Sequence, residues 1–478
     1  MINDWEIVMG LEVHAQLKTE SKLFSSSPNQ FGSDPNNNVN YIDAGMPGML
    51  PVMNSGCIDK AIKTGFALNF KINPYSVFER KNYFYADLPQ GYQISQFEYP
   101  ILTEGFVEIE SENSLKKIRL ERAHLEQDAG KSIHDIDPKY SFIDLNRVGT
   151  PLLEIVSYPD FSSADEVINY LTNLRQILMY IDVCDGNMQE GSLRADINLS
   201  VKKPNSKLGT RCEIKNMNSF KFIRQAIEYE SKRQIEVLES GNKIEQNTLL
   251  FDTSTGETRP MRSKEFAHDY RYFPDPDLLP INISQDQIEK AKMKIGELPN
   301  QKLTKFIDDL GLEKDIAKII ISEKQYAEFF EGLISTKLIK AKTAASWLVG
   351  DIFSFIKDKN IQINEILNKS QKIIELLQLV EKGTISSKVG KDILIEVLEK
   401  NKDPGLLVKE LGLEQVSDNE ELEKIVDESL SGEEENIQKF QSGSDRVLGY
   451  FVGKCLKATK GKGNPKIISD LLIKKIKK

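Results

Sequence analysis

Two hydrophobic patterns divide the chain. Up to about residue 290, segments in which every second residue is apolar alternate with segments whose apolar residues lie three or four positions apart. The first pattern predicts strands and the second predicts helices. Gly, Pro and Asn between these segments are typical of antiparallel strands. From about residue 295 the pattern is that of amphipathic helices rich in Lys, Glu, Leu and Ile. An α+β region followed by an all-α region is therefore predicted.

Two helices are clearest in the α+β region. The segment FSSADEVINYLTNLRQILMYIDVCDG (161–186) has five apolar residues at helical spacing: Val167, Leu171, Leu174, Leu178 and Ile181. Ser163 and Glu166 have the spacing of a capping box, and Gly186 is a candidate for the helix end. The second helix, FIRQAIEYESKRQIEVLESG (222–241), is predicted to stop at Gly241.

The length of 478 residues is too great for one ordinary core, so several domains are expected. The change of pattern and the break KDPGLL (402–407) predict three of them, at residues 1–292, 293–405 and 406–478. In the last domain Asn464 and Pro465 are expected at the cap and the first position of a helix.

Four predicted strands have a polar face that mixes acids with Arg, Lys or His. In IVMGLEVHAQL (7–17) the spacing puts Glu12 and His14 on one face and apolar residues on the other. Three further segments repeat this pattern, RLERAHLEQDAGKS (119–132), EGSLRADINLSV (190–201) and GTRCEIKNMNSF (209–220). Their polar faces carry Arg122, His124, Glu126, Asp128, Glu190, Arg194, Asp196, Arg211, Glu213 and Lys215. Solvent exposure explains one such face, but the recurrence of acids favours a site.

Carboxylates and an imidazole gathered on a sheet surface repel one another unless a cation lies among them. Hard oxygen ligands with one His favour Mg²⁺ or Mn²⁺ over zinc, and no Cys/His spacing for zinc is present. Magnesium in turn accompanies phosphates, which the interleaved Arg and Lys can bind. The alternative is that His14 is a satisfied core histidine.

The segment DAGKS (128–132) ends like a phosphate-binding loop. The first glycine of that motif is required five positions before Gly130, where the chain has Leu125. No GxGxxG pattern occurs either. A bound nucleotide is therefore expected on the sheet face.

Two further segments are candidate site walls. RKNYFYADLPQGYQISQFEYP (80–100) has six aromatic residues among Arg, Lys, Asn and Gln. It suits stacking on a nucleotide or an RNA end, or else is a packed hairpin. RPMRSKEFAHDYRYFPDPDLLP (259–280) combines charged residues with a rigid double-Pro turn at Asp275 and Asp277, which favours a site wall.

Charge is distributed unevenly along the chain. Residues 436–478 contain eleven Lys or Arg and two Asp, a net charge of +9, whereas the whole chain carries −9. Residues 1–435 therefore carry −18. The basic end predicts a partner with phosphates, and a solvated Lys-rich terminus is the alternative.

Composition predicts a soluble globular protein, with 40% hydrophobic and 28% charged residues. The sequence contains no uninterrupted apolar run of about 18 residues, so no membrane span is expected. The N-terminus lacks the pattern of a signal peptide. The four cysteines form no CxxC pair, which suits reduced thiols. A cytoplasmic protein without a membrane or DNA partner is expected.

Seven motifs taken in order resemble one known family. They are GLEVHAQL, RKNYFYADLPQGYQISQ, HLEQDAGKS, DLNRVGTPLLEIVS, EGSLRADINLS, EIKNMNSF and DYRYFPDPDL. Together they resemble the GatB subunit of the bacterial and organellar aspartyl/glutamyl-tRNA(Asn/Gln) amidotransferases. The segment GYFVGKCLKATKGKGNPK (449–466) is similar to the tRNA-binding tail of that subunit.

The resemblance implies an ATP- and Mg²⁺-dependent phosphorylation of the side-chain carboxylate of Glu or Asp misattached to tRNA(Gln) or tRNA(Asn). Ammonia, which the amidase subunit of the complex releases from glutamine, then displaces the phosphate, and a small third subunit completes the heterotrimer. The implied fold is a curved antiparallel-sheet cradle related to glutamine synthetase, followed by a helical domain and the tail.

The resemblance also implies roles for individual residues. Metal ligands are Glu12, His14 and Glu126, with Glu190, Asp196 and Glu213 as further candidates. Catalytic candidates are Glu126, Lys81, Arg194, Lys215 and Arg271. Cofactor-binding candidates are Tyr83, Asp128, Lys131 and Asn216, and tRNA-binding candidates are Lys457, Lys460, Lys462 and Lys466. Many relatives have an acid in place of Gln127, so the ligand role is expected to fall on Glu126 and Asp128.

Two alternatives belong to other functional classes. One is a non-catalytic tRNA-binding scaffold, against which the acidic strand faces argue. The other is a carboxylate kinase acting on a small molecule, which would keep its activity without residues 436–478. The preference between Glu-tRNA(Gln) and Asp-tRNA(Asn) stays open.

Overall fold

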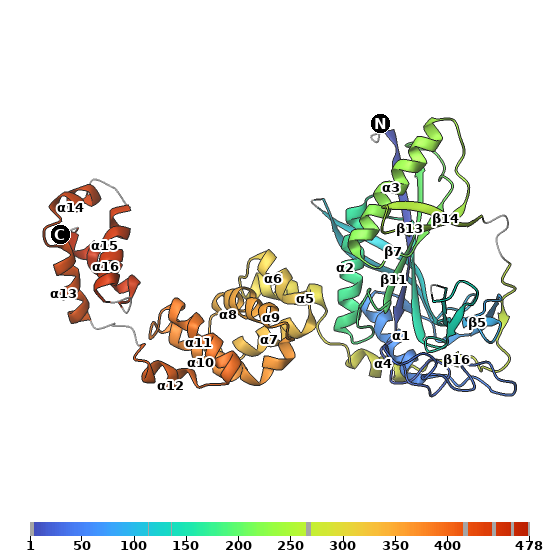
Figure 1. Ribbon diagram of the computed structural model, residues 1–478, viewed down its shortest axis with the longest axis horizontal. Helices are drawn as coiled ribbons and strands as arrows, with labels where there is room; N and C mark the ends of the chain where they lie inside the picture. Colours follow the sequence, from blue (N-terminus) through green and yellow to red (C-terminus); the bar gives the residue numbers. More distant parts are fainter. Residues whose placement is uncertain are drawn as a thin grey trace. The chain divides into compact units, whose positions relative to one another are not determined.

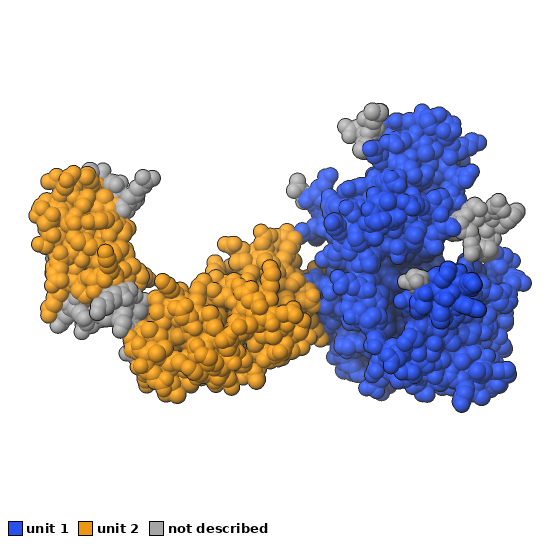
Figure 2. All heavy atoms as spheres, in the orientation of Figure 1, with its two compact units in different colours: residues 1–299 blue, residues 300–478 orange. Residues whose placement is uncertain are grey.

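The computed structural model describes residues 4–112, 114–134, 136–263, 269–413, 419–441, 446–459 and 463–476. The chain forms two compact units, Met1–Pro299 and Asn300–Lys478, which Figure 2 colours separately. The first is mixed α+β and the second is helical, which confirms the predicted class. The finer division into three domains stays a prediction.

A nine-stranded sheet forms the centre of the first unit (Figure 1). All neighbouring strands are antiparallel except β12 and β13, which are parallel. From one edge to the other the strands are β14 (Glu257–Ser263), β13 (Asn247–Asp252), β12 (Cys212–Lys215), β11 (Leu193–Lys202), β1 (Glu6–Gln16), β10 (Pro151–Ser157), β7 (Ser114–Gln127), β6 (Leu102–Ser111) and β2 (Lys71–Ile72).

The two faces of this sheet differ as the alternation predicted. On β1 the residues Met9, Leu11, Val13 and Ala15 are buried in the core. That face is covered by helices α1 (Ser55–Ala67), α2 (Ala164–Tyr180) and α3 (Phe220–Glu239). Burial of this apolar surface is the main force that holds the layers together. The opposite face carries the polar residues.

Short strands and one more helix complete the first unit. One small sheet contains β15 (Phe273–Pro274), β4 (Glu79–Asn82) and β5 (Tyr92–Ser95). Two pairs are β16 (Ile281–Asn282) with β3 (Tyr75–Ser76), and β8 (Lys131–Ile133) with β9 (Phe142–Asp144). Helix α4 (Gln285–Met293) follows. The aromatic segment 80–100 thus contains the hairpin of β4 and β5, and its stacking role stays a prediction.

The ends of the two predicted helices show where sequence signals were sufficient. Helix α3 ends at Glu239, and Gly241 adopts the left-handed conformation expected after it, with φ 81°. Helix α2 ends at Tyr180, six positions before the predicted Gly186. Asp182 takes the left-handed position there, with φ 55°, and the N–H of Val183 donates to Leu178 O at 2.9 Å. Asp tolerates this conformation better than most residues, so no Gly was needed.

The predicted capping box of α2 is half formed. The Ser163 hydroxyl accepts from the backbone N–H of Glu166 at 3.2 Å, as expected. The Glu166 carboxylate does not return to Ser163; it accepts from the N–H of Ser162 at 2.8 Å and from Lys116 Nζ at 2.8 Å. A cation on β7 therefore competes with the local cap for this carboxylate.

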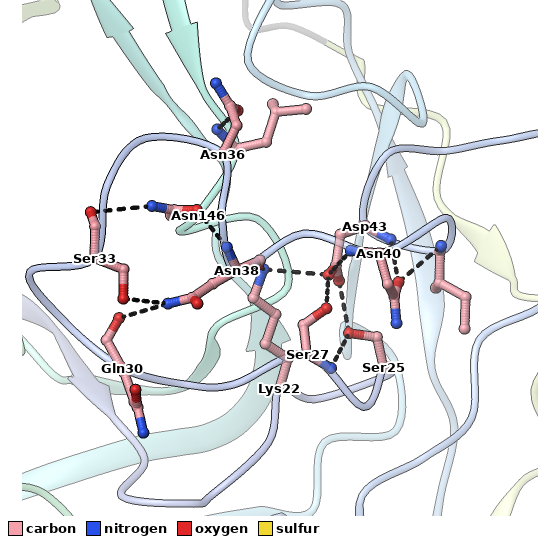
Figure 3. A network of polar contacts seen from close by, with 12 residues as sticks. Lys22, Ser25, Ser27, Gln30, Ser33, Asn36, Asn38, Asn40, Asp43 and Asn146 are labelled. Carbon is pink, nitrogen blue, oxygen red and sulfur yellow. Dashed lines mark hydrogen bonds and ion pairs between the residues drawn. The ribbon is translucent and has the colours of Figure 1, made fainter.

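A long connection between β1 and α1 is held by a buried polar network (Figure 3). Lys22 and Asp43 are both almost fully buried, and Lys22 Nζ lies 3.3 Å from Asp43 Oδ2. Asn38 joins this connection to a second loop, because its N–H donates to Asn146 Oδ1 at 2.8 Å. The loop that leads into β10 is fixed by the same network.

The second unit is built from helices. It begins within α5 (Pro299–Thr304) and continues through η2 (Lys305–Asp309), α6 (Lys314–Ile321), α7 (Lys324–Ile334), α8 (Ala341–Trp347), η3 (Leu348–Ile352), α9 (Phe353–Lys359), η4 (Ile363–Lys369), α10 (Ser370–Glu381), α11 (Ser387–Lys400) and α12 (Pro404–Glu410). The last four are α13 (Asn419–Leu430), α14 (Glu434–Gln441), α15 (Arg446–Ala458) and α16 (Pro465–Ile476). The break at KDPGLL is confirmed, since Asp403 caps α12.

The last four helices enclose a core of their own. Leu422, Phe451, Cys455, Ile468 and Leu472 are all fully buried in it. The predicted start of α16 is confirmed, since Asn464 Oδ1 accepts from the N–H of Lys466 at 3.0 Å. Among the helices of the described ranges, none has the length and apolar character required to cross a bilayer.

Candidate functional site

Four central strands place a row of polar side chains on the helix-free face of the sheet. His14 on β1 lies opposite Arg194 on β11 and opposite Glu154 on β10. Glu154 in turn lies opposite His124 on β7. The row therefore crosses four adjacent strands, and the strand register alone brings it together. Glu12 lies two residues before His14 on β1, on the same face of the sheet and opposite Asp196 of β11.

Two members of this row, His14 and Glu154, form a cluster with Glu126 of β7. His14 Nε2 is 3.3 Å from Glu126 Oε1 and 3.6 Å from Glu154 Oε2. One nitrogen and two carboxylate oxygens of these residues all lie within 4.8 Å of one another. We call His14, Glu126 and Glu154 the acidic triad. Its donor set, two carboxylates and an imidazole, suits a hard divalent cation.

The electrostatics of the acidic triad are strongly perturbed. Burial opposes the charge of His14, but Glu126 and Glu154 outweigh this and hold its pKa well above the usual range. Burial likewise opposes the charge of Glu154, whereas His124 and His14 hold its pKa well below the usual range. Concentrated, partly compensated charge of this kind is typical of functional sites.

Two adjoining cavities open above the acidic triad. They have volumes of about 620 Å³ and about 440 Å³ and share His14, Lys81, Lys215 and Met261 in their walls. We call the two cavities together the cleft. Its size is that of a site for a nucleotide-sized ligand. The predicted residues that line it are Glu12, His14, Lys81, Tyr83, Glu126, Asp128, Arg194, Asp196, Glu213, Lys215 and Asn216.

Two of the three cations in the cleft form ion pairs with acids. Lys215 Nζ lies 2.5 Å from Asp196 and 2.9 Å from Glu213. The guanidinium of Arg194 lies 2.8 Å from Asp128 Oδ2. These side chains are therefore oriented before any ligand binds.

Lys81 is the third of these cations. Burial opposes its charge, but the field of Glu126, Tyr272 and Glu154 outweighs burial and raises its pKa. Lys81 therefore stays charged in the cleft.

Glu12 lies beside the acidic triad without belonging to it. Its carboxylate accepts from Asn198 Nδ2 at 3.0 Å. Burial, with help from Glu154 and Glu213, raises its pKa. The structure thus groups His14 with Glu154 more closely than with Glu12, although the sequence had paired His14 with Glu12.

Three predicted residues lie outside the cleft. Glu190 is exposed in the turn before β11, which begins only at Leu193. Lys131 is exposed on β8, and Arg271 is exposed with its N–H bound to Asp269. Among the described residues that line the two cavities, none of the three occurs. Glu190 lies in a turn, Lys131 on β8 and Arg271 in a loop, all outside the four strands that carry the row, so their assignment to the site stays a prediction that the geometry of the cleft does not support.

Two residues of the site were missed by sequence reasoning. Glu154 stands in PLLEIVS, a strand buried along its whole length, and was not singled out. A single acid in an otherwise apolar strand is the signal that identifies it. Alternation puts His124 on the polar face of its strand but assigns it no role, and its Nε2 lies 3.2 Å from Glu154 Oε2.

Gly130 explains the resemblance of DAGKS to a phosphate loop. Its N–H donates to Asp87 O at 2.8 Å. A Cβ at this position would lie 2.9 Å from the backbone oxygens of both Asp87 and Asp144. The glycine is required by close packing of three backbone segments, which agrees with the rejection of a phosphate-binding loop.

Tyrosines from two distant segments enclose one wall of the cleft. Tyr83 donates to Gln93 Oε1 at 3.1 Å, and its ring lies edge-on to Tyr270 with centroids 6.0 Å apart. Lys81 Nζ lies 4.9 Å from the Tyr270 ring centroid. Residues 264–268, within the predicted wall 259–280, lie outside the described ranges. The turn that follows is fixed by Arg80, which lies 2.8 Å from Asp275 and from Asp277.

The tRNA-binding candidates lie in the second unit. Lys457 is exposed near the end of α15, and Lys466 is exposed in the first turn of α16. Lys460 and Lys462 lie outside the residues that the structure describes.

Comparison with known proteins identifies the family. Residues 7–289 match the GatB/GatE catalytic domain, and residues 328–476 match the GatB domain. The GatB subunit of the aspartyl/glutamyl-tRNA(Asn/Gln) amidotransferase of Pelagibacter ubique is 50% identical over 477 residues, which cover 99% of this chain and 97% of that protein. The corresponding subunits of Rickettsia conorii and Paramagnetospirillum magneticum are 50% and 49% identical, each over 99% of this chain and 98% of the relative.

The chain belongs to the GatB family of amidotransferase subunits. Membership confirms the resemblance based on the seven motifs and makes the chain part of a glutamine-hydrolysing ligase. Every residue named above as lining the cleft falls within the match to the GatB/GatE catalytic domain. The cleft is therefore the candidate active site of this GatB family member.

Proposed function

We propose that the cleft phosphorylates the side-chain carboxylate of Glu or Asp attached to tRNA(Gln) or tRNA(Asn), with ATP as the phosphate donor. In this reaction a carboxylate oxygen attacks the γ-phosphorus, and ADP leaves. Ammonia derived from glutamine then attacks the acyl carbon, and phosphate leaves with the formation of the amide. A carboxylate is a poor acyl donor, and the phosphate supplies its leaving group.

The observation that carries this proposal is the combination of the acidic triad with three cations above it. Both substrates are anionic, so an acidic floor alone would repel them. Lys81, Arg194 and Lys215 supply three positive charges in the walls of the same cleft. Phosphoryl transfer depends mainly on such positioning and neutralisation of charge. A surface that only binds RNA has no use for the buried carboxylates of the triad.

A divalent cation fits the acidic triad. His14, Glu126 and Glu154 would hold it, because they offer one imidazole and two carboxylate atoms within 4.8 Å of one another. A Mg²⁺ ion bound there would neutralise the phosphates of ATP and the carboxylates of the triad. Asp196 and Glu213 are engaged by Lys215, so we assign them to the orientation of that cation. Lys81 can then face the reacting anions in this arrangement.

The wider assembly follows the family. We infer that the chain works with an amidase subunit and a small third subunit in a heterotrimer, and that the exposed lysines of α15 and α16 contact tRNA. The broad sheet open on one face supports the proposed likeness to the glutamine synthetase cradle, and a cytoplasmic location suits a translation enzyme.

The decisive experiment uses the complete complex with Glu-tRNA(Gln) and labelled ATP, with hydroxylamine to trap the acyl phosphate. Glu126→Gln removes one charge from the triad at nearly constant size. We expect trapped product to form about 10²–10³-fold more slowly, the range for loss of one charge-stabilising group. Glu190→Gln makes the same change on an exposed turn and is expected to retain the wild-type rate.

Normal trapping by Glu126→Gln would contradict the catalytic assignment and favour the scaffold alternative. The small-molecule kinase makes a different prediction, since it phosphorylates free carboxylates as readily as aminoacyl-tRNA. Comparison of free glutamate with Glu-tRNA(Gln) in the wild-type complex separates it from the proposed reaction.

A further inference from the structure

His124 lies beside the acidic triad, on β7 opposite Glu154 of β10. Its Nε2 is 3.2 Å from Glu154 Oε2, and its side chain is 5% exposed. It is absent from the described residues that line the two cavities of the cleft. A ligand in the cleft therefore contacts Glu154 but not His124.

The surroundings of the ring decide which nitrogen carries the proton. Nδ1 of His124 is buried and has no hydrogen-bond partner among the described residues. A proton on Nδ1 would be a buried donor without an acceptor, which is costly. The ring N–H is therefore on Nε2 and donates to Glu154.

Glu154 depends on this donor more than the distances alone suggest. Among the described residues, its carboxylate has His14 and His124 as hydrogen-bonding or ion-pair partners, and both approach the same oxygen, Oε2. A cation bound by His14 uses the lone pair of Nε2, and this nitrogen then has no proton to donate. His124 is the donor that remains.

We propose that His124 is a positioning residue that fixes the Glu154 carboxylate for binding of the divalent cation. This inference rests on the proposed metal role of the acidic triad. A ring that donates its N–H to a ligating carboxylate restricts the rotation of that carboxylate and so reduces the ordering required when the metal binds. Substitution of such groups typically lowers metal affinity about 10–100-fold.

Matched variants separate the N–H donor from the packing of the ring. His124→Phe keeps a ring of similar size without a donor. His124→Gln loses the ring but carries an amide N–H at nearly the reach of Nε2, whereas the amide of His124→Asn falls short. Mn²⁺ binding to the complete complex, followed by electron paramagnetic resonance without ATP or tRNA, measures the affinity directly. His134→Phe, an exposed position bound to Ser141, is the control.

We expect His124→Phe and His124→Asn to bind Mn²⁺ about 10–100-fold more weakly than wild type, and His124→Gln within about threefold of it. Wild-type Mn²⁺ affinity in His124→Phe or His124→Asn would overturn the proposal. A loss of Mn²⁺ affinity in His124→Gln as large as that in His124→Phe would also overturn it. Circular dichroism identifies any variant that does not fold, and the Gln and Asn pair then still tests the donor. Unchanged Mn²⁺ binding by Glu154→Gln would instead refute the metal role of the triad, which is a distinguishable failure.

Discussion

Replacement of Asp43 by Asn is expected to destabilise the first unit by about 3–5 kcal/mol. Asp43 is the counter-charge of Lys22, and the side chains of the two residues are 2% and 0% exposed. Removal of one member of a buried ion pair leaves the other charge without compensation. The effect is therefore much larger than that of a surface pair, which contributes about 0–1 kcal/mol.

The hydrogen bonds around Asp43 allow the charge to be removed almost alone. Oδ2 accepts from three donors, the hydroxyl of Ser27 at 2.6 Å, Lys22 Nζ at 3.3 Å and the N–H of Asn40 at 3.1 Å. Oδ1 faces the hydroxyl of Ser25 at 2.8 Å, which can also accept. An Asn side chain can thus place its oxygen at the Oδ2 position and its NH₂ toward Ser25.

The properties of Lys22 limit the magnitude. Burial lowers its pKa, and Asp43 opposes this effect. Without Asp43 the amine can lose its proton, which for an ordinary pKa of about 10.4 costs about 4.6 kcal/mol at pH 7. Its bond to Asn38 O, at 2.6 Å, survives in either state. The cost therefore stays below about 5 kcal/mol.

Scanning calorimetry measures the effect as a shift in the melting temperature, Tm. For a unit of 299 residues the unfolding entropy is about 0.6 kcal/mol per degree, so Tm should fall by about 5–8 °C. Asp34→Asn, an exposed position on the same connection, should change Tm by less than about 1 °C. The double variant with Lys22→Met should be more stable than Asp43→Asn. A shift below 1 °C for Asp43→Asn, or additive losses in the double variant, would refute the reasoning.

Three further predictions concern other parts of the chain. All four thiols are buried, and burial raises the pKa of Cys57 and Cys184 to about 12. A disulfide reagent at pH 8 should therefore react slowly with the native protein, whereas after denaturation it should react with all four thiols. Gly130→Ala should destabilise the first unit by about 1–3 kcal/mol in the same calorimetric assay, since its Cβ would meet two backbone oxygens at 2.9 Å. Lys457→Glu with Lys466→Glu should raise the KM for tRNA and reduce the slope of log K against log salt by about 1–2, while normal KM and slope would contradict tRNA binding by these helices.

The core of the last four helices determines how tRNA binding by the tail can be tested. Charge alone suggested deletion of residues 436–478 as the test of RNA binding. The structure places Leu422 in the same core as Phe451 and Leu472. Deletion would remove α15 and α16 and expose the residues that α13 contributes to this core, and loss of function would then report misfolding. Exposed lysines are the better targets because their substitution leaves the core intact.

The fold was predictable where periodicity and caps are local. Alternation identified β1, β7, β11 and β12, and Gly241 marked the end of α3. The order of the strands was not predictable, since β1 lies between β10 and β11, which are far from it in sequence. No local pattern records such pairing. The early end of α2 was missed for a different reason, because Asp182 adopts a conformation that the sequence suggested for Gly186.

The same distinction explains the candidate site. Alternation placed His14 and Glu126 on polar faces, but alternation on one strand says nothing about which residues meet across strands. The register pairs His14 with Glu154, and that pairing makes Glu154 a closer neighbour than Glu12. A strand buried on both faces has no alternation to reveal a polar residue. An acid within such a strand must nevertheless be compensated, so a lone Glu in a run such as PLLEIVS indicates partners on the neighbouring strands. Here those partners are the two histidines, and the functional signal lies in the exception to the hydrophobic pattern.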